Sequence, residues 1–324
     1  MAGRAEAKPA PRAPAEDPSL GDFWRDMIEP HGEVVTGIVA KARNALGKLG
    51  ETAADGDGAV DQRLRYVSDA YGMLRYARKL SPENPDVLSL FGTAADELGK
   101  TPQALEALLA CVRILGPGRA GSEVTGRLGM IYLRMGKLDD AIRWLRYAQG
   151  PISTADNAAA AVNLATALAA RGEMANAIDV LANALPAQTN YFTDPVTLVS
   201  FALAVHYDRD EQRAAAFEVL DKMQATLQQE LGTFAQRALA GMRFTPPEDQ
   251  YYYRALLYEA LGDYTEARAE WSLYASVTDA PWRRRALDHV HAIDAQRSAQ
   301  PGPHKAPQAS PSQNRLHHHR RPVP

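Results

Sequence analysis

Residues 126 to 149 read GRLGMIYLRMGKLDDAIRWLRYAQ, and this stretch decides the fold. Large and small side chains recur at helical spacing on both sides of Gly136. Small residues let two helix backbones approach, and large residues fill the layer between them. The pattern therefore predicts two short antiparallel helices that meet at a turn. The small positions are Gly129, Ala141 and Ala148, and the large ones are Leu128, Tyr132 and Leu145.

The same order of residues returns along the chain, and each turn glycine is followed five residues later by an alanine. The glycines are Gly99, Gly136, Gly172 and Gly262, and the alanines are Ala104, Ala141, Ala177 and Ala267. The first three glycines are 37 and 36 residues apart, from 99 to 136 and from 136 to 172. Such a period is typical of a helical solenoid, because one helix pair cannot bury its apolar face without a neighbour. We therefore predict an all-α stack of helix pairs.

Two further copies of the pattern are weaker. One reproduces only the second half of the pattern and ends at Pro82, and we interpret it as a degenerate first repeat. Another follows the long loop 187–195 and has no turn glycine. The stretch from Gln224 to Met242 then continues at helical spacing and adds extra length before the last clear copy. The exact number of repeats stays open.

With these residues the chain resembles the tetratricopeptide repeat (TPR) family, in the form of a bacterial-type scaffold protein. The resemblance covers residues 58–297 and is best over 122–150. It implies a right-handed superhelix of antiparallel helix pairs, whose first helices line a concave groove that binds peptides or partner proteins. It implies no catalysis. The basic clamp with which one subgroup of the family holds acidic C-termini is not present.

The composition divides the chain into four segments. Residues 1–21 are rich in proline and alanine and are expected to be disordered, as is the basic tail 298–324, which contains proline and histidine and no acidic residue. Residues 22–57 are expected to form an N-terminal helical cap, and 58–297 the repeat array. The cap is expected to end in a loop marked by Gly56 and Gly58.

The overall charge and the single cysteine limit the function. A net charge of −3 gives no basic field over the whole chain, so a nucleic-acid partner is not expected from the bulk of the protein. Cys111 has no second cysteine with which to form a disulfide, and no apolar run is long enough to cross a membrane. We expect a cytoplasmic location for the chain as written. Because the Pro/Ala-rich start resembles a linker after a removed signal, a periplasmic or envelope-associated location is the alternative.

No recognisable catalytic, cofactor or metal motif is present, so we expect no enzyme activity, no cofactor, no metal and no small-molecule substrate. His289 and His291 are two residues apart and would point about 200° apart on a helix, so they are interpreted as part of a solvated helix end. His206 lies within an apolar helix, where packing or groove lining is favoured over catalysis.

The first helices of the repeats predict a binding surface. Positions three and four residues apart share one helix face, which in this family is turned toward the groove. That face is notably apolar, with arginines at its margin. Either it is an exposed groove that accepts an apolar or amphipathic segment, or it is buried as ordinary core. The residues are Arg127, Met130, Leu133, Arg134, Val162, Thr166, Phe201, Val205, Tyr252 and Leu256.

These observations favour a non-enzymatic scaffold or adaptor that holds a peptide segment or partner protein in the groove. Two alternatives stay open. One is an exported component of a bacterial envelope, motility or secretion machine. The other is a regulatory protein that contacts nucleic acid through the basic tail, which has Lys305, Arg315, Arg320 and Arg321. The sequence does not predict the oligomeric state or the identity of the partner.

Overall fold

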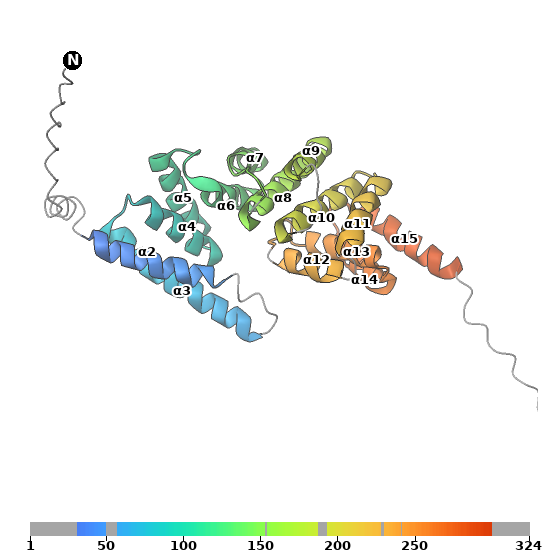
Figure 1. The fold of residues 1–324 in the computed structure, drawn as a ribbon, viewed down its shortest axis with the longest axis horizontal. Helices are drawn as coiled ribbons and strands as arrows, with labels where there is room; N and C mark the ends of the chain where they lie inside the picture. Colours follow the sequence, from blue (N-terminus) through green and yellow to red (C-terminus); the bar gives the residue numbers. More distant parts are fainter. Residues whose placement is uncertain are drawn as a thin grey trace, which may run out of the picture.

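The computed structural model describes residues 31–49, 57–152, 154–186, 193–227, 230–240 and 242–299. This described part consists of helices joined by short turns, and it contains no strand. The helices are α2 (Gly32–Gly47), α3 (Asp57–Leu80), α4 (Pro85–Glu97), α5 (Thr101–Leu115), α6 (Gly121–Arg134), α7 (Leu138–Tyr147), α8 (Ala155–Ala170), α9 (Met174–Ala184), α10 (Asp194–Arg209), α11 (Arg213–Leu227), α12 (Leu231–Ala240), α13 (Asp249–Leu261), α14 (Tyr264–Ser276) and α15 (Arg283–Ala299) (Figure 1).

The predicted all-α array of helix pairs is confirmed. Successive helices pack on each other as α2–α3, α4–α5, α6–α7, α8–α9, α10–α11 and α13–α14, and each pair packs on the next along the chain (Figure 1). Helix α12 accounts for the extra helical length predicted between 224 and 242, and it packs mainly on α10. Helix α15 packs on α14 at the end of the array.

The N-terminal helix α2 packs along α3 as the first helix of the first pair, and it also contacts α4. The division of the chain into a cap over 22–57 and an array over 58–297 stays a prediction. Gly58, which we expected in a loop, lies within α3, because that helix begins at Asp57. Residues 1–30 and 300–324 lie outside the described residues, and with them lie most of the two segments predicted to be disordered.

Turns within the pairs require left-handed backbone, and glycine supplies it at most of them. Gly99, Gly136, Gly172 and Gly262 have φ angles of 69°, 69°, 88° and 80°. Glycine adopts this region without the clash that a Cβ atom causes. At the corresponding turn between α10 and α11 the residue is Glu211, with a φ of 60°. The turn geometry is therefore kept where the sequence pattern lacks its glycine.

Gly129 shows why the pattern alternates in size. A Cβ atom added to Gly129 would lie 2.4 Å from Leu145 Cγ and 3.2 Å from the Leu145 backbone nitrogen. Ala141 and Ala148 are fully buried in the same contact between α6 and α7. Leu145 thus fills the space that the missing side chain leaves, and the two helices approach closely.

The buried hydrophobic residues form two clusters that meet in α6. The first core runs from Val35 in α2 to Ile131 in α6, and the second core runs from Leu133 in α6 to Ile293 in α15. Tyr132 is partly buried and packs against both. The array is therefore built as two packed halves that share one helix. Among the described helices, none has the length and apolar character needed to cross a membrane.

Candidate partner-binding cavity

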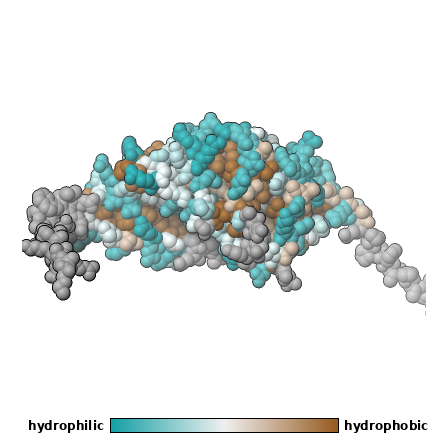
Figure 2. Space-filling model, turned by 45° about the horizontal axis from the view of Figure 1, so that its top comes forward, coloured by the Kyte–Doolittle hydropathy of each residue, from teal (hydrophilic) through white to brown (hydrophobic). Residues whose placement is uncertain are grey.

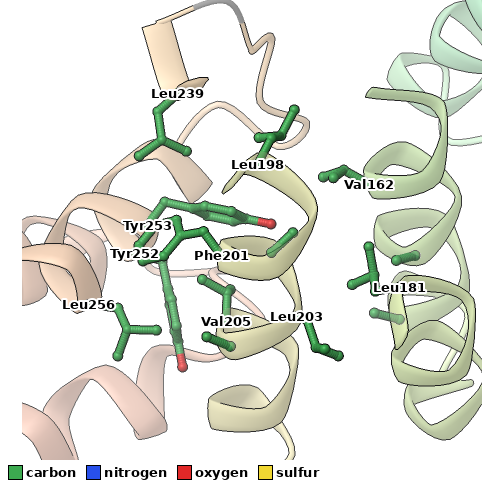
Figure 3. Packing of buried hydrophobic residues seen from close by; sticks show 14 of the residues in the cluster. Val162, Leu181, Leu198, Phe201, Leu203, Val205, Leu239, Tyr252, Tyr253 and Leu256 are labelled. Atoms are coloured by element: carbon green, nitrogen blue, oxygen red, sulfur yellow. The ribbon is translucent and has the colours of Figure 1, made fainter. Parts of the chain in front are cut away.

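Most of the apolar residues predicted to line a groove lie in the core instead. Six of the ten predicted residues are buried in the second core, between α6, α8, α10 and α13 (Figure 3). These six are Leu133, Val162, Phe201, Val205, Tyr252 and Leu256. Their exposed fractions do not exceed 6%, the value of Leu133. The interpretation as ordinary core is therefore the correct one for these positions.

The physical reason is the position of α10 within the second half. It contacts α8 and α9 on one side and α12 and α13 on the other, so it has almost no face left for solvent. Phe201 meets Tyr253 edge to face at 5.9 Å between ring centroids (Figure 3). Apolar residues all around a helix indicate burial on every side rather than a groove. The inserted α12 supplies part of this cover.

The other four predicted residues are at least partly accessible. Arg127 and Met130 are partly buried, Arg134 is exposed, and Thr166 is partly buried and donates its hydroxyl to the Val162 carbonyl oxygen at 2.9 Å. Arg127 and Met130 both line a small hollow beside α6. Their role in binding a partner stays a prediction.

A cavity of about 920 Å³ lies on the concave side next to Arg127. The first helices of four successive pairs, α2, α4, α6 and α8, all contribute to its wall, together with Arg63 of α3 and the segment after α12. Its lining combines leucines with charged side chains. The lining residues are Arg43, Leu46, Gly47, Leu49, Arg63, Leu90, Thr93, Glu97, Glu123, Arg127, Asp156, Met242 and Arg243.

Two carboxylates at the end of α4 organise the arginines of this cavity. Arg127 Nη1 lies 3.0 Å from Asp96 Oδ2 and 3.1 Å from Glu97 Oε1. Arg63 Nη2 lies 3.2 Å from Glu97 Oε2, and Arg134 donates to Asp96. The two carboxylates are almost fully buried, while Arg63, Arg127 and Arg134 keep part of their surface in solvent. Buried carboxylates paired in this way fix the arginine side chains in position.

The pKa of Glu97 reflects this arrangement. Burial alone would raise the pKa of its carboxyl group, but the guanidinium groups of Arg243 and Arg127 outweigh burial and hold the pKa below its ordinary value. Glu97 is therefore ionised at neutral pH and holds the arginines through charge-assisted hydrogen bonds. Of these residues the sequence predicted Arg127 and Arg134, and it missed Arg63, Asp96, Glu97 and Arg243.

A smaller hollow of about 60 Å³ continues the cavity between α6 and α8. It shares Glu123, Arg127 and Asp156 with the larger cavity and adds Met130 and Asn163. Glu123 and Asp156 are exposed acidic residues in the first turns of their helices, where they complement the helix dipole. Exposed acidic side chains of α6 and α8 thus line the cavity together with the arginines.

One of the two histidines on α15, His289, does not lie at a solvated helix end as the sequence suggested. His289 is buried rather than solvated, while His291 is exposed as predicted. The His289 ring lies between two carboxylates from other helices and stacks on Trp271 at 4.2 Å between ring centroids. The carboxylates belong to Asp208 of α10 and Glu259 of α13. In the sequence, the one sign of this network was the acidic residue Asp208, which directly follows the apolar run FALAVHY.

Further partners complete this buried network. Tyr252 donates its hydroxyl to Asp208 at 2.7 Å, and Arg285 donates to the same carboxylate at 2.5 Å. Trp271 Nε1 and Arg213 Nη2 donate to Glu259 at 3.1 and 2.8 Å. Because both carboxylates accept from several donors, the network ties α15 to α10, α13 and α14 and serves structure. Within the described ranges, no group of histidine, cysteine and acidic residues could hold a metal ion.

His206 packs as expected from its apolar surroundings. It is fully buried, and its Nδ1 atom lies 2.8 Å from the Ala202 carbonyl oxygen. Burial lowers its pKa to about 3, so the ring is neutral at physiological pH. Beside it, Arg209 is buried between Tyr252 and Trp282 and pairs with Asp249 at 2.9 Å. These groups belong to the core of the second half and not to the cavity.

Comparisons with known proteins found no matching family model and no matching curated protein. Solved structures with similar folds include PilF of Pseudomonas aeruginosa, at 14% identity and a TM-score of 0.47, covering 80% of this chain and 99% of that one. Another is PilW, described as a type IV pilus biogenesis factor, at 16% identity and 0.45, covering 76% and 98%.

A third is the kinesin light chain of Podospora anserina with nearly identical TPR-like repeats, at 18% identity and 0.45, covering 60% of this chain and 98% of that one. The helical-repeat fold that the tetratricopeptide repeat resemblance implies is seen in the helix pairs of the described residues.

Proposed function

We propose that this chain is a non-catalytic scaffold that holds a polypeptide segment of a partner protein in the concave cavity. The observation that carries the proposal is the shared wall, to which the first helices of four successive pairs contribute. Successive repeats place equivalent side chains in a row, and a row of positions suits an extended chain that contacts several of them at once. Arg127, Met130, Arg134 and Thr166 are retained as candidate contact residues.

The chemistry of the lining supports a polypeptide occupant. Leu46, Leu90 and Met242 offer apolar contacts, and the Asp96–Glu97 cluster with its arginines offers charged ones. Apolar pockets beside charged groups are the usual means by which a groove recognises alternate side chains of a bound segment. The arginines are held in place before any partner arrives, which reduces the entropy lost on binding.

The test is site-specific photo-crosslinking in the producing cell. A benzophenone amino acid replaces Glu123 at the cavity rim, and the matched control replaces Asp179, an exposed acid on the second helix of the next pair. We expect a discrete crosslinked partner at position 123 that is absent at position 179. The crosslinked segment of that partner, identified by mass spectrometry, should bind the purified protein as a synthetic peptide. Equal crosslinking at both positions, or a peptide that does not bind, would refute the proposed site.

A further inference from the structure

Arg243 belongs to the second half of the array by its local contacts. It lies just after α12, and the neighbouring residues hold the backbone there. The Met242 amide donates to the Leu239 carbonyl oxygen at 3.0 Å, and the Phe244 ring lies 5.1 Å from the Tyr253 ring. Met242 and Phe244 both pack against the second core. We call residues 242–244 the strap.

The side chain of Arg243 nevertheless reaches the first half. Its Nη2 atom donates to Glu97, which lies 146 residues earlier in the chain, and its Nη1 atom is 3.9 Å from Asp96 Oδ2. Arg243 and Met242 thereby form one side of the cavity whose other sides come from α2, α3, α4, α6 and α8. The strap therefore occupies space in the cavity that the proposed function gives to a partner segment.

The contact of Arg243 with Glu97 joins the two halves of the array. Glu97 is at the end of α4, within the half built on the first core, and the strap is anchored on the second. The two halves share α6, whose Arg127 also lines the cavity. The Arg243 ion pairs join the halves at a second place, in addition to the shared helix α6.

Breaking the contact of Arg243 with Asp96 and Glu97 should cost little free energy. Arg243 keeps 37% of its side chain exposed, so salt and water screen its ion pairs. Asp96 and Glu97 are also held by Arg63, Arg127 and Arg134. When Arg243 leaves, the two buried carboxylates keep three guanidinium partners, so no buried charge is left alone.

We propose that the strap is a reversible closure of the cavity, in which Arg243 occupies the place of a partner side chain and must leave before a partner segment is fully seated. This rests on the proposed function only in its second part, the competition with a partner. The closure itself is a property of the chain alone. Opening the strap exposes Asp96, Glu97 and the leucines of α2 and α4 to an incoming segment.

The closure is tested by a distance measured across the cavity mouth. Spin labels are placed on cysteines that replace Leu64 of α3 and Thr233 of α12, both exposed. Cys111 is 1% exposed, so we expect it not to react with the label in the folded protein. Pulsed electron paramagnetic resonance should give a narrow distribution of distances between the two labels at low salt. Arg243→Glu should increase the mean distance and broaden the distribution. In the parent, 1 M salt should shift the distances toward those of the variant.

The matched control is Arg143→Glu, which makes the same charge change at an exposed residue that pairs with Asp140 in its own helix. It should leave the distribution unchanged. An unchanged distribution in Arg243→Glu would overturn the closure, whether or not a partner exists. Circular dichroism of both variants checks that they are folded.

The competition is tested with the synthetic peptide identified by crosslinking at position 123. Arg243→Glu should bind it about threefold to tenfold more tightly than the parent. The reason is that the closed state, in which Arg243 occupies part of the site, is less populated in the variant. Equal affinity in the two proteins, with the distance change present, would overturn the competition and keep the closure. Absence of any peptide binding would refute the proposed function and leave the distance result standing.

Discussion

The Nδ1 atom of His289 lies 2.7 Å from Glu259 Oε2, and its Nε2 atom lies 3.0 Å from Asp208 Oδ2. A neutral imidazole has one N–H group, so both contacts are hydrogen bonds only when the ring is protonated. Burial alone would lower the pKa of His289, but the hydrogen bonds to Asp208 and Glu259 outweigh burial and raise it above its ordinary value. A buried imidazolium therefore joins α15 to α10 and α13.

The stability of the protein should depend on pH through His289. Its pKa is higher in the folded state than in the unfolded chain, so its contribution is fully present below the ordinary histidine pKa of 6.5 and is lost as pH rises through the folded value. We expect the free energy of unfolding, measured with urea, to fall from pH 7.5 toward pH 9, above the ordinary histidine pKa of 6.5 up to which buried, neutral His206 adds stability as pH rises. His289→Gln should lower it by about 3 kcal/mol at pH 6 and by less at pH 9.

His291→Gln is the control for the pH experiment, because His291 is exposed on the same helix. It should keep both the stability and the pH profile of the parent. A parallel pH profile in His289→Gln and the parent would contradict the buried imidazolium.

The contact between Gly129 and Leu145 predicts opposite effects for two glycine changes on α6. Gly129→Ala should lower the free energy of unfolding by about 1–3 kcal/mol, because its Cβ atom would overlap Leu145. A Cβ atom in Gly126→Ala would lie 3.6 Å from the Ala148 Cβ atom and 4.0 Å from the Ala160 Cβ atom, both ordinary contacts, so this change should stabilise the helix by about 0.5–1 kcal/mol. Urea denaturation of both variants measures the difference. Equal stability of the two would show that α6 and α7 can move apart.

The turn at Glu211 predicts a stabilising change. Glu211→Gly should raise the free energy of unfolding by about 0.5–1 kcal/mol, since glycine has no Cβ atom to clash at a φ of 60°. The reciprocal change Gly136→Ala, at the corresponding turn with a φ of 69°, should lower it by about 1 kcal/mol. Thermal unfolding followed by circular dichroism measures the stability of both variants relative to the parent. A loss of stability in Glu211→Gly would mean that the glutamate side chain contributes more than its backbone strain costs.

Burial of Leu133 and Val162 predicts that neither tolerates a charge. Leu133→Glu and Val162→Glu should each lower the free energy of unfolding by about 3 kcal/mol or more, because each places an unpaired carboxylate in the second core. Met130→Glu, at a partly buried position that lines the small hollow, should change stability much less. Urea denaturation compares the three. Wild-type stability of Val162→Glu would restore the groove interpretation for that residue.

The helix pairs could be predicted because their signals are local. Gly129 and Leu145 meet across one turn, and the glycine at each turn is visible as a spacing in the sequence. Whether an apolar helix face is core or groove depends instead on how many helices cover it. For α10, which carries Phe201, that number includes α12, whose place on α10 no spacing shows.

The charged sites were harder to predict because their members are distant in sequence. His289 meets Asp208 across 81 residues, and Arg243 meets Glu97 across 146. Helical spacing placed Arg127 and Arg134 on the accessible side of α6, but it could not show that both would hold Asp96. Such pairs follow from the superhelical path of the array, which the period alone does not specify.

The packing of each helix pair on the next pair along the chain also bears on how the protein reaches its native state. Contacts between elements close in sequence require only short loops to close, which favours rapid folding from any point in the array. A pair can therefore form on the ribosome before the following pair has been translated. The pairing of Arg243 with Glu97 must wait until the intervening helices are in place. Its formation would mark the end of assembly, and a kinetic probe at the cavity mouth should change later than the helical signal.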